Sequence, residues 1–474
     1  ESDGQNSFKV TSSNKDINGT EIRLFIKKDE KDYLDTFRIE NIVKKYSDHI
    51  PYPVKLLETG KDEEVKSLNS ASALWMRSKK DISKDQYNEF YNHLGGMGKP
   101  WHIIHNTTEG LVSFTNLLFI PEMKPFDLFS PERKTSVKLY TNRVFITDEC
   151  ETLLPSYLRF IKGVIDSEDI DLNVSREMMQ SNAALKKISK ALVNRVLNEL
   201  KKILEKDRDG YEKFFGEFGA AFKEGIYEDF ERRKALLDLS LFKNSTDDKL
   251  ISINEYISRM KEEQKDIYYI SGESAEQVMT SPQLEGFKSR GLEVLLMIDP
   301  VDEFWLPSFN EYEGKTFKSI TKGNADLSKF KVTDDKDKKK KQKPLSDKAL
   351  EELISEMKSQ LKGKVKDIKV SQVLTDSPVC LTADEGEMDM HLERLMRQHK
   401  RVENESKKIL EINGNHDLVK SLAKLVSESG DKKLVGDISH LLLDQARISE
   451  GELPVDTKNF TDRLSSIMTR GLKV

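Results

Sequence analysis

The chain reads Ile267-Tyr268-Tyr269-Ile270, then a helical pattern around residues 275–279, and then Val294-Leu295-Leu296-Met297-Ile298. Both apolar runs have the length of buried strands. A strand, a helix and a second strand in this order are typical of a parallel strand pair. The stretch therefore predicts an α/β unit in the second half of the 474-residue chain.

A larger α/β region is expected before this unit. Residues 111–120 and 137–146 are rich in β-branched and aromatic residues and are bounded by turn-forming or charged segments, so each predicts a strand of one sheet. Over residues 185–204 the apolar positions recur with a period of about 3.6 residues, which predicts a long amphipathic helix. Whether the unit at 267–298 is separate from this region is left open.

The first part of the chain does not read as a complete domain. Alternation over residues 22–26 predicts a half-buried strand, and the spacing over residues 34–46 predicts a helix. One strand and one helix cannot bury a core. We therefore expect residues 1–58 to be the tail of a domain whose beginning is absent, followed by a linker at residues 59–68.

A charged run divides the remaining chain. Residues 331–343 are almost wholly charged, with consecutive lysines at 338–341, and we take residues 331–345 as a linker. The interspersed aspartates and Pro344 favour a solvated linker, and a basic tail that binds nucleic acid is the alternative. The run separates a predicted middle domain, residues 69–330, from a C-terminal domain, residues 346–474.

The C-terminal domain is predicted to begin with a helix at residues 350–361 and a strand at residues 365–373. It ends in two amphipathic helices whose apolar residues include Leu434, Ile438, Leu441, Leu442, Leu464, Ile467 and Met468. Such helices either fold back on their own domain or complete a four-helix contact between two copies of the chain. Both alternatives stay open at this point.

Composition narrows the class of protein. The chain carries 77 Lys and Arg against 82 Asp and Glu, a net charge of -5, which gives no general attraction to nucleic acid. No apolar run approaches about twenty residues and the start is polar, so we expect a cytoplasmic protein without a membrane span. Cys150 and Cys380 are the two cysteines, which argues against a disulfide framework or a metal site.

The stretch Asp171-Leu172-Asn173-Val174-Ser175-Arg176-Glu177 leads into a predicted helix and is the best indication of function. Arg176 and Gln180 are four residues apart, so both side chains can reach one ligand from one helical face. An arginine beside a helix start suits phosphate. A solvated or ion-paired surface arginine is the alternative explanation.

Several segments together resemble the heat-shock protein 90 chaperone family, in their order and spacing as well as in their residues. The segments are Tyr46-Ser47-Asp48-His49-Ile50, Arg143-Val144-Phe145-Ile146, Leu154-Pro155-Ser156-Tyr157-Leu158-Arg159-Phe160, Leu172 to Glu177, Glu217-Phe218-Gly219, Lys223-Glu224-Gly225, Ser258-Arg259-Met260-Lys261, Ile267 to Ile270 and Asp376-Ser377-Pro378. The chain looks most similar to the bacterial branch, because the first linker is short. It also lacks the acidic C-terminal pentapeptide with which eukaryotic relatives recruit cochaperones.

The resemblance implies an architecture. The middle domain is expected to be an α/β/α sandwich with a second, smaller α/β unit, followed by an α+β dimerisation domain that ends in helices. Residues 1–58 resemble only the end of a gyrase/histidine-kinase type ATP-binding domain. Thr20 is the one nucleotide contact that carries over, so we expect this chain alone to be inactive and to hold no tightly bound cofactor.

The resemblance also implies an activity. The complete protein is expected to be an ATP-dependent molecular chaperone of the stress response, using ATP with Mg, that binds and remodels partly unfolded client proteins as a homodimeric clamp. A bacterial Hsp70-type system is a possible partner. Arg176 would reach the γ-phosphate, with Gln180 in support, as an arginine finger does. The alternative is a non-enzymatic dimeric scaffold that binds clients or cochaperones without nucleotide.

The resemblance also implies that two segments contact clients. Phe304 and Trp305 follow two acidic residues, and adjacent aromatic residues in a polar loop must either pack as a plug or bind a partner. The second segment is rich in methionine, whose flexible side chain suits a surface that accepts many partners, although methionine at helical spacing is more often core. Its apolar residues are Met388, Met390, Leu392, Leu395 and Met396.

Replacing Arg176 by alanine in a full-length protein is expected to lower ATP turnover steeply and to leave nucleotide affinity nearly unchanged, because the arginine acts on the transferring phosphoryl group. Steady-state ATPase kinetics and nucleotide titration measure the two effects. Normal hydrolysis by the variant would contradict the role assigned to Arg176.

Overall fold

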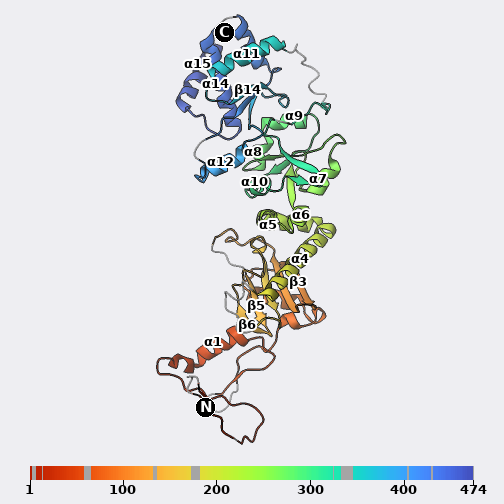
Figure 1. The fold of residues 1–474 in the computed structure, drawn as a ribbon, viewed down its shortest axis with the longest axis vertical. Helices are drawn as coiled ribbons and strands as arrows, with labels where there is room; N and C mark the ends of the chain where they lie inside the picture. Colours follow the sequence, from red (N-terminus) through yellow and green to blue (C-terminus); the bar gives the residue numbers. More distant parts are fainter. Residues whose placement is uncertain are drawn as a thin grey trace.

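The computed structural model describes residues 1–2, 7–12, 14–57, 66–131, 136–171, 182–323, 325–332, 345–402, 405–428 and 431–472. The molecule is elongated, and its parts follow one another along the long axis in sequence order (Figure 1). Several separate sheets and many helices build these parts, which confirms the predicted multidomain α/β fold class. Among the described helices, none has both the length and the apolar character that crossing a bilayer requires.

The N-terminal segment contains a short 3-10 helix, η1 (Lys31–Leu34), and one α-helix, α1 (Thr36–Ser47). Asp35 caps α1 by accepting a hydrogen bond from the Arg38 backbone N–H at 2.9 Å, and α1 confirms the helix predicted here. The strand predicted for residues 22–26 is wrong, because none of the described segments pairs with these residues. Alternation alone does not make a strand, since the backbone groups need a neighbour. A two-stranded ladder of β1 (Lys55–Leu56) and β2 (Lys66–Ser67) follows.

The first large sheet has the strand order β3-β4-β7-β5-β6. The bounds are β3 (Pro100–Thr108), β4 (Phe114–Pro121), β5 (Ser136–Thr141), β6 (Val144–Thr147) and β7 (Lys162–Asp166). The predicted strand at 111–120 is confirmed as β4. The region 137–146 lies in the same sheet but forms a hairpin rather than one strand. Asn142 and Arg143 take φ angles of 50° and 67° there and turn the chain back in two residues.

Helices cover both faces of this sheet. Phe119 of β4 packs on one side in a cluster with α2 (Lys84–His93). Leu118 points to the other side, where α4 (Ala183–Lys206) and α5 (Arg208–Glu228) lie. The arrangement is the expected α/β/α sandwich, and α4 confirms the long amphipathic helix predicted from the 3.6-residue period.

The second sheet has the order β12-β13-β10-β11-β8-β9. Its strands are β8 (Leu241–Asn244), β9 (Ile251–Ser252), β10 (Ile267–Ser271), β11 (Leu295–Met297), β12 (Glu311–Tyr312) and β13 (Lys315–Ser319). Its helices are α7 (Ile253–Arg259), α8 (Ala275–Met279), α9 (Glu285–Lys288) and α10 (Asp302–Trp305). The strands β10 and β11 are parallel, with Tyr269 opposite Leu295, which confirms the predicted pair.

The two α/β parts share one core. Helices α5 and α6 (Arg233–Asp238) lie between the two sheets (Figure 1). A continuous apolar cluster extends from Leu118 in the first sheet to Trp305 and Phe317 beside the second. The second unit is therefore packed onto the first, which answers the question that the sequence left open.

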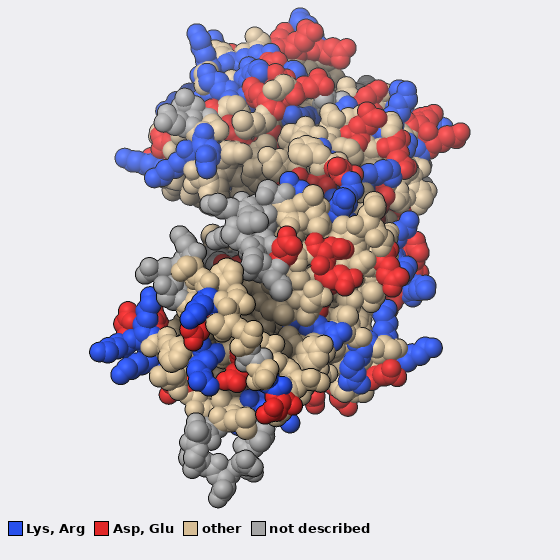
Figure 2. Space-filling view, turned by 60° about the horizontal axis from the view of Figure 1, so that its bottom comes forward, with Lys and Arg blue, Asp and Glu red and all other residues tan. Residues whose placement is uncertain are grey.

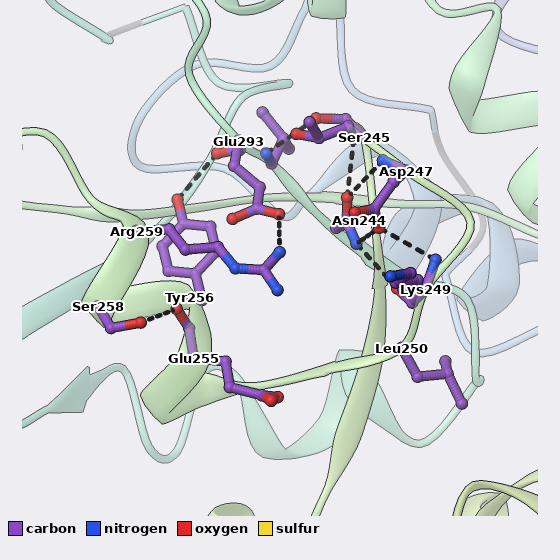
Figure 3. A network of polar contacts seen from close by, with 12 residues as sticks. Asn244, Ser245, Asp247, Lys249, Leu250, Glu255, Tyr256, Ser258, Arg259 and Glu293 are labelled. Atoms are coloured by element: carbon purple, nitrogen blue, oxygen red, sulfur yellow. Dashed lines mark hydrogen bonds and ion pairs between the residues drawn. The ribbon is translucent and has the colours of Figure 1, made fainter. Parts of the chain in front are cut away.

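One segment that carries the family resemblance, residues 258–261, contacts the chain just before β11 of the second sheet. Arg259 pairs with Glu293 at 3.2 Å, and the Tyr256 hydroxyl donates to the Glu293 carbonyl at 2.9 Å (Figure 3). Beside them, the Asn244 side chain organises the loop after β8 through four hydrogen bonds. These contacts give the segment a structural role.

The C-terminal part contains a three-stranded sheet in the order β14-β16-β15, covered by helices. Its elements are α11 (Asp347–Gln360), β14 (Asp367–Val370), β15 (Val379–Thr382), α12 (Met390–Gln398), β16 (Ile409–Ile412), α13 (Asp417–Glu428), α14 (Lys432–Ser449) and α15 (Thr457–Gly471). The predicted helix at 350–361, the predicted strand at 365–373 and both terminal helices are confirmed, the strand in shortened form. The packing is α+β, as expected.

A buried ion pair ties α5 to α10. The Lys223 ammonium lies 2.7 Å from Asp302 and 2.6 Å from Asp299, and the side chains of Lys223 and Asp302 are almost wholly inaccessible. Asp302 also accepts a hydrogen bond from the Trp305 indole N–H at 2.9 Å. Burial by itself would lower the pKa of Lys223, but the two carboxylates raise it above its usual value. Lys223 therefore stays charged inside the core.

Replacing Lys223 by methionine is expected to lower the free energy of unfolding by about 3–5 kcal/mol, because Asp302 loses its buried cation. Urea denaturation followed by circular dichroism measures the change. Lys190→Met is the matched control, since Lys190 pairs with Glu231 at 3.0 Å on the surface and both side chains are mostly exposed. A change below about 1 kcal/mol is expected there, and equal losses in the two variants would contradict the prediction.

Candidate functional site

The predicted phosphate-sensing residues Arg176 and Gln180 lie outside the described residues, as does the whole of segment 172–177. Thr20, the predicted nucleotide contact, is exposed. The described residues within 1–57 include no buried side chain, so they do not enclose a nucleotide. The described part of the chain therefore does not fit ATP at this position.

Two other segments that carry the resemblance meet beside the first sheet. His49 lies edge-on against Trp75 with ring centroids 4.7 Å apart, and Tyr46 of α1 lies 5.8 Å from Phe145 of β6. The Trp75 indole N–H donates to Asp166 of β7 at 2.9 Å. These contacts fix the end of α1 against the sheet, next to a cleft of about 740 Å³.

The helix α10 separates its two aromatic rings. Trp305 is 0% exposed and packs edge-on against Phe317 with ring centroids 5.4 Å apart. Phe304 is 43% exposed. The sequence left open which ring reaches solvent, and the structure answers that it is Phe304. Trp305 is the aromatic plug, so a surface role at this position belongs to Phe304.

The methionine-rich segment lies on α12 and on the turn before it. Met388 is 47% exposed. Met390, Leu392, Leu395 and Met396 are half-buried, and Met390 packs against the C-terminal core. The segment is therefore divided between core and surface, with Met388 at the exposed end.

Buried polar contacts dock α12 on the second α/β unit. His391 of α12 and Glu303 of α10 are both buried, with His391 Nδ1 2.9 Å from Glu303 Oε1. Asp389, the N-cap of α12, accepts hydrogen bonds from the hydroxyls of Ser319 at 2.5 Å and Thr321 at 2.8 Å. Burial raises the pKa of Glu303, and the hydrogen bond with His391 opposes that shift. The contacts bring α10 and α12 to opposite sides of one opening.

We call this opening the α10–α12 cleft, and its volume is about 720 Å³. Its apolar lining includes Tyr269, Leu306, Pro307, Phe317, Met388 and Leu392. Its charged lining consists of Asp266, Glu303, Lys318, Lys322, Glu385, Glu387 and Asp389. The cleft thus combines an apolar wall with an acidic one, and the second α/β unit and the C-terminal part both contribute to it.

On one face of the molecule, charged side chains of the two signs are mixed. On the face drawn in Figure 2, Lys and Arg side chains alternate with Asp and Glu side chains without a continuous basic stripe. Together with the net charge of -5, this face offers no broad electrostatic footprint for nucleic acid.

Comparison with known proteins assigns the chain to a protein family. The family model described as Hsp90 protein matches residues 58–474. The chain belongs to the Hsp90 family. Chaperone protein HtpG of Paramagnetospirillum magneticum is 48% identical over 472 residues, which cover 99% of this chain and 75% of that relative. The proteins of the same name from Roseobacter denitrificans and Wolbachia pipientis wMel are 45% and 44% identical, over 75% and 74% of their lengths. The resemblance to the bacterial branch is confirmed.

In this Hsp90 chain the two terminal helices differ in exposure. Leu442 of α14 is 2% exposed and belongs to the core of its own chain, whereas Leu434, Ile438 and Leu441 are half-buried. On α15 no side chain is buried. Leu464 is 40% and Met468 is 60% exposed there, with Ile467 half-buried. The apolar face of α15 is thus the part of the predicted contact that remains available.

Sequence reasoning missed part of the cleft in this Hsp90 chain. Tyr269 and Phe317 lie on strands whose pattern indicates only core, and Leu306 follows the predicted aromatic pair. The hydrogen bond between Glu303 and His391 joins residues that are 88 positions apart, so no local sequence pattern predicts it. In the sequence, the only indication of this contact is the acidic residue Glu303 beside Phe304, and its position predicts only a polar loop.

Proposed function

We propose that this chain is the client-binding and dimerising part of an ATP-dependent molecular chaperone. The observation that carries the proposal is the α10–α12 cleft, with Met388 exposed in its lining and Phe304 exposed on α10, next in sequence to the lining residue Glu303. Three relatives at 44–48% identity bear the name chaperone protein HtpG. We propose partly unfolded proteins as the substrates, because a chaperone function and an exposed apolar surface both suit them.

The cleft suits segments of varied sequence. Large exposed apolar side chains are unfavourable in water, so a cluster of them beside a cavity marks a binding surface. Methionine has several rotatable bonds and a polarisable sulfur, which lets one surface adapt to different partners. Met388, Leu392 and Phe304 therefore form the proposed client contact, with Met390, Leu395 and Met396 supporting α12 from its half-buried side.

The dependence on ATP is proposed for the complete protein. It rests on membership of the Hsp90 family and on the resemblance of segment 171–177, with Arg176 as γ-phosphate sensor and Gln180 in support. Thr20 would touch nucleotide, and Mg would accompany it. Because the described residues around Thr20 do not enclose a nucleotide, we derive no catalytic step from the structure. We further propose the cytoplasm as the location and a bacterial Hsp70-type system as a partner.

A non-enzymatic scaffold is the second candidate function. The exposed position of Thr20 favours it for the described chain, since a clamp without a nucleotide site would still hold clients. ATP hydrolysis by the full-length protein, measured with and without a client, separates the two candidates. Client binding without any ATPase activity would favour the scaffold.

We propose that dimerisation uses α15 together with the exposed side of α14. Leu464, Ile467 and Met468 form an apolar face on a helix without buried residues, and such a face needs a partner surface. Two copies related by a twofold axis would present the same face to each other.

The double variant Met388→Ser/Leu392→Ser is expected to require roughly tenfold more chaperone for equal protection of an aggregating client, because both side chains line the cleft. Light scattering of a heated client protein measures protection. Leu111→Ser is the control, since Leu111 is 94% exposed and does not line the cleft. Full protection by a correctly folded, dimeric double variant would count against the proposed client site.

The double variant Leu464→Glu/Met468→Glu is expected to convert a dimer into a monomer at micromolar concentration, because two charges would face their copies across the interface. Light scattering coupled to size exclusion gives the mass. This variant tests the contact more specifically than a deletion from residue 434 onward, because such a deletion would also remove Leu442 of α14 from the core. Leu418→Glu on α13, at a leucine 39% exposed, is the control. A wild-type monomer, or an unchanged dimer in the double variant, would overturn the dimer proposal.

A further inference from the structure

We propose that the α10–α12 cleft selects client segments in which an apolar side chain is flanked by lysine or arginine. This inference rests on the proposed chaperone function and adds the chemical class of segment that the cleft binds. Its basis is the combination of an apolar wall and an excess of carboxylates in one cavity.

The charged lining is unequal in sign. Five carboxylates, Asp266, Glu303, Glu385, Glu387 and Asp389, line the cleft against the two ammonium groups of Lys318 and Lys322. The excess of three negative charges gathers in one cleft, although the whole chain carries a net charge of only -5. The acidic character is therefore a local property of the cleft.

The two cleft lysines already have partners within the chain. Lys318 faces Asp266 at 3.9 Å. The Lys322 ammonium donates to the backbone carbonyls of Glu387 at 2.7 Å and Glu385 at 3.3 Å. Lys322 thus holds the turn before α12 in place.

A neighbouring lysine does not reverse the excess. Lys366 pairs with Glu387 at 3.0 Å and with Asp384 at 2.5 Å. Lys366 and Asp384 both lie outside the cleft lining. Adding these two residues to the charge count therefore adds one cation and one anion. Including this pair leaves the excess of three carboxylates in the described lining unchanged.

The apolar wall strengthens the attraction of this charge for a cation. Tyr269, Leu306 and Phe317 line the same cavity as the carboxylates and contribute apolar surface to it. A cleft with low-dielectric walls and one sign of charge concentrates its field and raises the local concentration of opposite charges. A client ammonium or guanidinium group at the rim would meet that field.

The size of the cleft sets the length of the segment. A volume of about 720 Å³ lies within the range of small-molecule sites, about 300–1,000 Å³. It therefore takes one or a few side chains of an extended segment and excludes a folded surface. An apolar anchor would lie against Leu306 and Leu392, with flanking basic residues at the acidic rim formed by Glu385 and Glu387.

Three labelled peptides of equal length and equal apolar centre test the inference, with lysine, serine or glutamate on both flanks. Fluorescence anisotropy with the full chain at low salt is expected to show roughly tenfold tighter binding of the lysine peptide than of the glutamate peptide. At high salt the ratio is expected to approach one, because salt screens exposed charges. Glu385→Lys, at an exposed turn residue, is expected to lower the ratio at least threefold.

The control variant is Glu351→Lys, since Glu351 is exposed on α11 and does not line the cleft. It is expected to keep the wild-type ratio, and Asp266→Asn serves as a second cleft variant if Glu385→Lys does not fold. Equal binding of all three peptides, or a ratio that Glu385→Lys and Asp266→Asn leave unchanged, would overturn the charge preference alone. Failure of the serine peptide to bind, or its indifference to Phe304→Ala/Met388→Ser, would instead overturn the proposed client site.

Discussion

The helix α10 is the element on which the arrangement of the cleft depends. A helix has about 3.6 residues per turn, so four successive side chains point in four different directions. Asp302 points into the core toward Lys223 of α5, and Glu303 points toward His391 of α12. Trp305 fills the core beside Phe317, which leaves Phe304 to face solvent. One helical turn thus joins the sandwich, the second sheet and the C-terminal part.

This geometry explains why an exposed phenylalanine is tolerated. Its neighbours on both sides are fixed, Glu303 by a buried polar contact and Trp305 by an aromatic contact and a hydrogen bond to Asp302. Turning Phe304 inward would rotate those groups out of their buried positions, which would leave the buried Lys223 without its contact to Asp302. The packing of α10 therefore keeps the Phe304 ring exposed without any contribution from a bound partner.

Sequence patterns predicted the elements that local periodicity determines. Helix α4 and the parallel pair β10 and β11 follow from apolar spacing alone. The strand expected at residues 22–26 failed because pairing depends on a neighbour, and the run at 137–146 became a hairpin because two positive φ angles interrupt it. Whether Phe304 or Trp305 is buried depends on Asp302 and on Phe317, and no pattern within the aromatic pair contains that information. The role predicted for the Arg176 segment follows from its sequence similarity to the family, and the segment lies outside the described residues.

The junction between the second α/β unit and the C-terminal part is polar where it carries the family segment Asp376-Ser377-Pro378. Glu285 of α9 accepts hydrogen bonds from the backbone N–H groups of Thr375, Asp376 and Ser377 at 2.8, 2.8 and 3.1 Å. Directional contacts of this kind can be replaced by water when two parts separate, whereas an apolar junction would expose its surface at a high cost in free energy. The walls of the α10–α12 cleft come from the two sides of this junction, so a change in the junction changes the width of the cleft. The clamp proposed for this chain would need a joint of this chemistry, because its binding surface would have to open and close.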